Sequence, residues 1–205
     1  MIVKWIVCQV SDPVAFDRGQ RGWTDLAALP GFLGQIGGWS TTVPGQAHVL
    51  GFWNDRRDHD AFMAGAHDRL ASDQQGSYSG IEARLFASAL EIGTLRLTDL
   101  ARTEVVRLAH CLVRPDRREH FVTVQGDVWI PAMAAAEGML GGTFGERDRE
   151  RDEFLVLSLW ESADAHDAYG TGSVRRLRET AGVADDVDRL VGALIELEPA
   201  WTVLP

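Results

Sequence analysis

Hydrophobic residues in the first half of the chain gather in four short runs that predict β-strands, and the first of these is rich in β-branched and aromatic residues. These runs are residues 2–10, 33–40, 47–53 and 81–92. A stripe of apolar residues at helical spacing follows Ser11-Asp12-Pro13, a sequence that suits a helix N-terminus. A second helical stripe starts after Asn54 or Asp55 and runs from His59 to Leu70. The order β-α-β-β-α-β predicts a ferredoxin-like unit.

The second half of the chain repeats this pattern. The glycine-rich run from Gly31 to Gly38 recurs from Gly138 to Gly145, each time between a helical stripe and a strand. At the same offset, the next apolar strand ends in Trp53 in one copy and in Trp160 in the other. Such an internal repeat decides the architecture that a sequence predicts. In the second copy, Pro131 is expected to kink the first helix or to begin a new turn.

A ferredoxin-like unit covers one face of its sheet with helices and leaves the other face bare, and an apolar bare face needs a partner. Two copies fused in one chain can supply that partner to each other. We therefore predict an α+β fold of two tandem ferredoxin-like repeats that form an intramolecular pseudo-dimeric α/β barrel. Repeat 1 would span residues 1–93, a connector 94–104, and repeat 2 residues 105–205, whose closing strand is expected over 194–204.

Charge and composition exclude several functions. The net charge of -10 disfavours nucleic acid, because that affinity comes largely from lysine and arginine on phosphates. No run approaches the roughly 20 apolar residues of a membrane span, and the N-terminus lacks the pattern of a signal peptide, so a cytoplasmic location is expected. Cys8 and Cys111 occupy equivalent strand positions and are expected to be reduced core residues. The chain is expected to act as a monomer with pseudo-two-fold symmetry or as a homodimer of it.

His67 is the strongest candidate for chemistry, because it lies at the margin of an apolar helical stripe and histidine suits proton transfer near neutral pH. It could be a general base or a ligand that faces a pocket, or a histidine with a purely structural hydrogen bond. His48 lies in a strand among apolar neighbours and could line the same pocket. His59 and His166 are equivalent and are expected to pack on the tryptophans that end the third strands. No cysteine or histidine spacing indicates a metal site, and the glycine runs do not match phosphate loops.

Several motifs resemble a known family. The first half resembles the YdbC-like proteins of unknown function through Gly31 to Trp39, Gly51-Phe52-Trp53, Phe62-Met63 and His67-Asp68. The second half resembles the wider antibiotic-biosynthesis-monooxygenase-like group of dimeric α/β barrels through Gly138 to Gly141, Leu159-Trp160-Glu161 and Ala168. The second half lacks an equivalent of His67-Asp68, so a site built on that pair would occur once per chain.

The resemblance implies three functional hypotheses. The first is a small-molecule enzyme with oxygenase-like chemistry and no tightly held cofactor, acting on a planar aromatic or enolic substrate. His67 would deprotonate the substrate there, and Trp39, Trp53, Tyr78 and His48 would shape the site. The second is a protein that binds or degrades haem, with His67 as the iron ligand. Haem-degrading relatives use a tryptophan where this chain has Phe62, and an asparagine on the first strand, which has none here. The third is a binding or stress-related module without a retained active site, so the sequence leaves open whether the protein is an enzyme.

Overall fold

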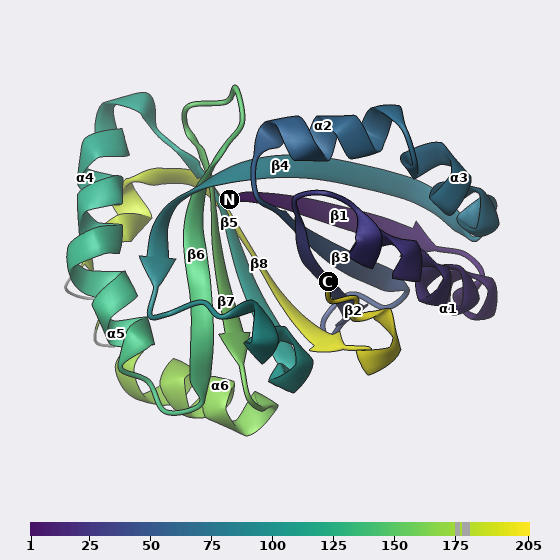
Figure 1. The fold of residues 1–205 in the computed structure, drawn as a ribbon. Helices are drawn as coiled ribbons and strands as arrows, with labels where there is room; N and C mark the ends of the chain where they lie inside the picture. The colour runs from purple at the N-terminus through teal and green to yellow at the C-terminus, as the bar shows by residue number, and fades with distance from the viewer. Residues whose placement is uncertain (175–176, 178–180) are drawn as a thin grey trace. The chain divides into compact units, whose positions relative to one another are not determined.

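The computed structural model describes residues 1–174, 177 and 181–205. The chain divides into two compact units: unit 1 is Met1–Leu85 with Ile195–Pro205, and unit 2 is Phe86–Leu194. Each unit combines antiparallel strands with helices that pack on its sheet (Figure 1). The predicted α+β class is therefore confirmed. No helix in the described parts of the chain is long and apolar enough to cross a membrane.

Unit 1 follows the predicted element order. Its elements are β1 (Ile2–Val10), α1 (Pro13–Arg21), β2 (Phe32–Ser40), β3 (Gln46–Trp53), α2 (Arg56–Ala64), α3 (His67–Ala71) and the first part of β4 (Tyr78–Ile92). Strand β3 lies between β1 and β2, and all three are antiparallel neighbours. The register places Trp53, the last residue of β3, opposite Ile2 and Phe32. The core between helices and sheet contains Leu26, Phe32, Trp53, Phe62 and Leu70.

Local sequence signals begin the helices of unit 1. The Asp12 carboxylate caps α1 by accepting a 3.0 Å hydrogen bond from the Ala15 amide, and Pro13 occupies the first turn. The Asp55 carboxylate caps α2 by accepting from the Asp58 amide at 2.9 Å. The single second helix expected up to Leu70 is wrong, because α2 ends at Ala64, with Gly65 as its C-cap, and α3 begins at His67. Glycine stabilises a helix interior poorly and often ends a helix.

Unit 2 repeats this order with one irregular helix. Its elements are the end of β4, β5 (Val105–Val113), α4 (Arg118–Val124), α5 (Ile130–Ala134), β6 (Met139–Arg147), β7 (Glu153–Trp160), α6 (Ala163–Tyr169) and most of β8 (Val187–Leu197). A π-helical turn over Gln125–Trp129 joins α4 to α5, and Pro131 stands in the first turn of α5, as the sequence predicted. The long helical region expected after α6 extends into residues outside the described part of the chain. The closing strand expected over 194–204 is wrong in its bounds, because β8 spans Val187–Leu197. Pro199, which has no amide proton, starts a short 3-10 turn at Pro199–Trp201, so the strand does not continue to residue 204.

The glycine-rich runs give the two units the same strand irregularity. Gly34 has φ 154° and Gly141 has φ 145°, values that L side chains rarely adopt. The register between β2 and β3 shifts between Phe32 and Gly34, and the register between β6 and β7 shifts between Met139 and Gly141. The two copies therefore carry a β-bulge at equivalent positions, where the chain enters the strand that follows the first helical segment.

The fourth strand of each unit comes from the other repeat of the sequence. In unit 1, residues 195–197 at the end of β8 pair with residues 38–40 of β2. In unit 2, residues 86–92 at the end of β4 pair with residues 142–147 of β6. The strand order is β1-β3-β2-β8 in unit 1 and β5-β7-β6-β4 in unit 2. Each compact unit therefore ends inside a strand, and its core is completed by a segment distant in sequence.

Candidate functional site

Unit 1 holds a cavity of ≈ 100 Å³ between its helices and the face of its sheet that carries Lys4, Ile6 and Cys8. Most of its wall is aromatic or aliphatic, with Trp23, Leu26, Phe32, Val49, Trp53 and Phe62 among the lining residues. The polar lining includes Lys4, Gln20, Gln35, His67, Gln74 and Tyr78. An apolar wall with a few convergent polar groups is typical of a small-molecule site. Three residues that the sequence singled out, His67, Trp53 and Tyr78, thus line one cavity.

His67 is the first residue of α3 and lies at the edge of this cavity. Its Nδ1 is 2.9 Å from Oδ1 of Asp68, and its side chain is 26 % exposed. The ring lies 5.5 Å from the Phe62 ring and 6.2 Å from the Trp23 ring, measured between centroids. When Nδ1–H donates to the carboxylate, Nε2 carries the free lone pair, so the imidazole can accept a proton there. The Phe62 and Trp23 rings pack against this imidazole.

Trp53, the last residue of β3, lines the cavity on the side of the sheet. It is 2 % exposed, stacks on Phe62 with ring centroids 4.9 Å apart, and meets the edge of Phe32 at 5.3 Å. Contacts of this kind between large rings exclude water and hold the rings in a single arrangement. Tyr78, at the start of β4, closes another side and contacts Phe16 at 6.4 Å. Aromatic side chains therefore form several parts of the cavity wall.

Two other residues predicted for the site lie outside the lining of the cavity. Trp39 packs against Phe16 and Trp201, with centroid distances of 6.0 Å and 5.3 Å, in a second core cluster of unit 1. His48 alternates with the lining residues of β3 and so points to the other face of the sheet. The structure does not bring these two side chains to His67.

The histidines in strands have hydrogen-bond partners. Trp5 Nε1 donates to Nδ1 of His48 at 3.1 Å, and Nε2 of His48 lies 3.0 Å from Oε1 of Gln46. Burial lowers the pKa of His48 to about 4, so its ring is neutral at physiological pH. His110 Nε2 lies 2.6 Å from Oε1 of Glu153 on the neighbouring strand. Both rings are thus occupied by structural contacts.

His59 and His166 pack as the repeat predicted. The His59 ring meets Trp53 edge-on at 5.9 Å, and the His166 ring meets Trp160 in the same way at 5.5 Å. Burial is the largest cause that lowers the pKa of both histidines. The predicted shared structural role, packing on the tryptophan that ends the third strand, is confirmed.

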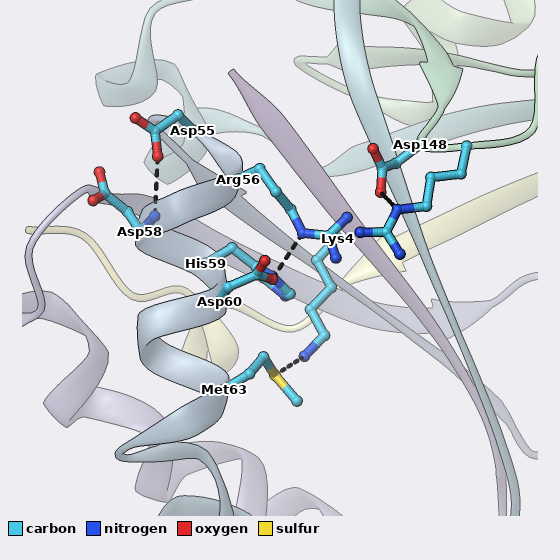
Figure 2. A network of polar contacts seen from close by, with 9 residues as sticks. Lys4, Asp55, Arg56, Asp58, His59, Asp60, Met63 and Asp148 are labelled. Carbon is cyan, nitrogen blue, oxygen red and sulfur yellow. Dashed lines mark hydrogen bonds and ion pairs between the residues drawn. The ribbon is translucent and has the colours of Figure 1, made fainter.

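Sequence reasoning missed Lys4 as a residue of the site. Lys4 is 8 % exposed, and its side chain extends from β1 to α2, where Nζ donates to Sδ of Met63 at 3.1 Å (Figure 2). Nζ also lies 5.5 Å from the centre of the Phe62 ring. Burial lowers the pKa of Lys4 from 10.5 to about 8. The signal was available, because strand alternation groups Lys4 with the apolar Ile6 and Cys8 on the covered face.

Unit 2 holds a larger cavity of ≈ 260 Å³ in the equivalent place. Among its lining residues, Nε1 of Trp129 and the hydroxyl of Tyr169 are buried and have no hydrogen-bond partner. Burial is the main cause that raises the pKa of Tyr169. Arg107 and Cys111 stand where unit 1 has Lys4 and Cys8, and no histidine or carboxylate is among the described residues of the lining. This cavity therefore offers hydrogen-bonding groups to a ligand, and the described part of its lining has no counterpart of His67.

Family models match both halves of the chain. Residues 2–86 match the domain of unknown function DUF4937, and residues 105–173 match the antibiotic biosynthesis monooxygenase family. Several solved structures are similar over nearly the whole chain. A Lactobacillus acidophilus protein provisionally named a monooxygenase is 14% identical with a TM-score of 0.75, over 99% of this chain and 95% of its own. The haem-degrading enzyme LmHde of Listeria monocytogenes is 8% identical with a TM-score of 0.54, over 96% of this chain and 99% of its own. At these identities the likeness establishes the fold.

The first half also matches a protein from Bacillus subtilis. The uncharacterized protein YdbC of that organism is 32% identical over 92 residues, which cover 42% of this chain and 77% of YdbC. The match is to the half of the chain that carries His67 and its cavity. The chain belongs to the YdbC family, and its second half carries an antibiotic biosynthesis monooxygenase domain.

Proposed function

We propose that the protein binds a small molecule in the cavity of unit 1 and acts on it as a cofactor-independent monooxygenase-like enzyme. The observation that carries the proposal is the convergence of His67, Trp53 and Tyr78 on one cavity with a largely apolar wall. Proton abstraction is easier to direct at a substrate that apolar walls hold away from water. The volume of ≈ 100 Å³ favours a substrate of about one ring, such as a phenol or a small enolic ketone.

The reaction begins with proton transfer from the substrate to Nε2 of His67. Asp68 accepts a hydrogen bond from Nδ1–H and stabilises the imidazolium that forms. The resulting carbanion reacts with dioxygen, and the hydroperoxide then loses water. An activated CH₂ group and O₂ are converted to a C=O group and H₂O. Trp53 and Phe62 hold the ring of the substrate, and the role of Tyr78 is to orient its oxygen.

The test is oxygen consumption with 1,3-cyclohexanedione and hydroquinone as probe substrates. We expect His67→Ala to lose at least about a hundredfold in turnover, which is the usual contribution of a general base, while its circular dichroism is unchanged. His166→Ala is the control for removal of a histidine, because this histidine packs on Trp160 and does not line the cavity of unit 2. An unchanged rate in His67→Ala would refute the role of His67.

Haem binding at His67, the alternative implied by the family, does not fit the cavity as its side chains stand. A site of ≈ 100 Å³ is smaller than the roughly 300–1,000 Å³ that ligands of drug size occupy, and a haem is no smaller than these. The rings of Phe62 and Trp23 also lie directly against His67. A haem titration followed by visible absorbance is expected to show no saturable Soret shift that depends on His67.

A specific observation also favours a second function, ligand binding without catalysis in the cavity of unit 2. A buried donor without a partner is unfavourable, and the oxygens of a bound ligand would accept hydrogen bonds from Nε1 of Trp129 and from the hydroxyl of Tyr169. The volume of ≈ 260 Å³ suits a bicyclic phenol. We expect 2-naphthol to raise the melting temperature of the wild type and to raise that of Tyr169→Phe less. Equal stabilisation of both proteins would contradict this assignment.

We further propose that the two sequence repeats form an intramolecular pseudo-dimeric α/β barrel and that the chain acts as a monomer or as a homodimer of that unit. Support comes from the repeat itself, from the equivalent β-bulges, and from the strand that each unit takes from the other repeat. Such an exchange couples the stability of the units. One cooperative unfolding transition is expected in calorimetry, whereas two well-separated transitions would argue against the barrel.

A further inference from the structure

Lys4 is the only lysine among the 20 lysine and arginine residues of the chain. All the other basic side chains are arginines, and several of these form exposed ion pairs, such as Arg21 with Asp17 and Arg56 with Asp60. Lys4 differs from them in place as well as in type, because it is 8 % exposed and lines the cavity of unit 1. The one lysine of the chain therefore lines the largely apolar cavity of unit 1.

The ammonium group of Lys4 has weak partners. It donates to the thioether of Met63 and lies over the ring of Phe62 (Figure 2). No carboxylate in the described parts of the chain forms an ion pair with Nζ, and thioether sulfur is a poor acceptor. A buried charge without a counter-charge is unfavourable, and burial accordingly lowers the pKa of Lys4 to about 8. A large share of this amine is neutral, and therefore nucleophilic, at slightly alkaline pH.

We propose that Nζ of Lys4 forms an imine with a small uncharged aldehyde or ketone that enters the cavity of unit 1. The lone pair of the amine attacks the carbonyl carbon, and a carbon–nitrogen bond forms. The carbonyl oxygen then leaves as water with the two hydrogens of the neutral amine. No oxidant or reductant takes part. A lysine desolvated in a hydrophobic pocket is the usual setting for this chemistry.

The lining selects the class of carbonyl compound. No arginine is among the described lining residues, so nothing pairs with the carboxylate of a 2-oxo acid. Trp53 and Phe62 instead favour an aliphatic or single-ring body. The Oε1 atom of Gln20 is buried without a partner and can accept a hydrogen bond from the hydroxyl of the addition intermediate. The thiol of Cys8 does not compete for the carbonyl compound, because burial raises its pKa to about 11.

Two residues of the cavity lining contact solvent, since Ile81 is 52% exposed and the side chain of His67 is 26 % exposed. This inference concerns the cavity of the proposed function, but it does not need His67 to act as a base. Imine formation and proton abstraction by His67 can therefore fail independently of each other.

The test is reductive trapping of the full-length protein at pH 7.5 with butanal and sodium cyanoborohydride. Trypsin cannot cleave after an alkylated Lys4, so the adduct gives a peptide that runs to Arg18 instead of ending at Lys4. The α-amine of Met1 is the internal reference. The lowered pKa gives Lys4 about a hundredfold more neutral amine than an ordinary lysine. We therefore expect the ratio of Lys4 adduct to Met1 adduct to be at least roughly tenfold higher in the folded protein than in urea.

A ratio that falls on folding would overturn the proposal, because it would mean that the folded protein shields the amine. Pyruvate, a charged probe, is expected to give much less Lys4 adduct than butanal, and equal trapping would overturn the assignment to uncharged carbonyl compounds. Lys4→Arg keeps the positive charge and should give only the Met1 adduct. His67→Ala should still be trapped at Lys4, which separates this inference from the role proposed for His67.

Discussion

Replacement of Lys4 by methionine should stabilise the protein. Methionine has a similar length and no charge, and the site is already bordered by Met63 and Phe62. In the folded protein the pKa of Lys4 is about 8, whereas the unfolded value is 10.5. Each tenfold change in an ionisation constant corresponds to about 1.4 kcal/mol, so burial of the ammonium disfavours the folded state by about 3 kcal/mol at pH 7. The variant no longer carries this charge.

The pH dependence makes the prediction specific. Between pH 8 and pH 10.5 the unfolded wild type keeps a proton on Lys4 that the folded protein has lost, so the stability of the wild type rises with pH. The variant lacks this dependence. Its advantage should therefore fall from about 3 kcal/mol at pH 7 to about 1.4 kcal/mol at pH 9.5.

Urea unfolding followed by tryptophan fluorescence at both pH values measures the difference, and the seven tryptophans of the chain supply the signal. Lys4→Arg is the matched control, since guanidinium stays charged and should make the protein less stable than the wild type at both pH values. The reasoning is refuted if Lys4→Met is less stable than the wild type at pH 7, or if its advantage does not change with pH. A lysine whose buried charge destabilises the folded protein fits a site that serves chemistry at the expense of stability.

Two further predictions test the packing. A Cβ at Gly38 would lie 2.0 Å from the carbonyl oxygen of Glu196, whereas a Cβ at Gly22 meets nothing within 4 Å. Gly38→Ala should therefore lower the free energy of unfolding by more than about 2 kcal/mol. Gly22→Ala should leave the free energy of unfolding unchanged or raise it slightly. Similar values for the two variants would show that β8 does not approach β2 so closely. Burial raises the pKa of Cys8 to about 11 and that of Cys111 to about 12. Both thiols should therefore react with iodoacetamide at pH 8 far more slowly in the folded protein than in urea. Equal rates would place both thiols at the surface.

Local sequence determined the elements of this protein and where most of them begin. Asp12 and Asp55 cap their helices with their own carboxylates, and such signals act within one turn of the chain. The glycine-rich runs were visible as a repeat, and they form the same bulge twice because the backbone at Gly34 and Gly141 needs values of φ that favour glycine. Part of the site was predictable for the same reason. His67 lies at the margin of a helical stripe and Trp53 lies at the end of a strand, so periodicity alone directs both toward the covered face of the sheet.

Tertiary structure decided which fourth strand completes each sheet, how much space remains under the helices, and what surrounds each polar group. The sequence could not predict that β8 would lie beside β2 or that the cavity of unit 2 would be the larger one, because both depend on contacts between distant segments. Trp39 and His48 were predicted for the site alongside Trp53, yet their neighbours hold them elsewhere. The reactivity of Lys4 follows from burial against Met63 and Phe62, and burial is a property of the packed molecule, not of the strand that carries the residue.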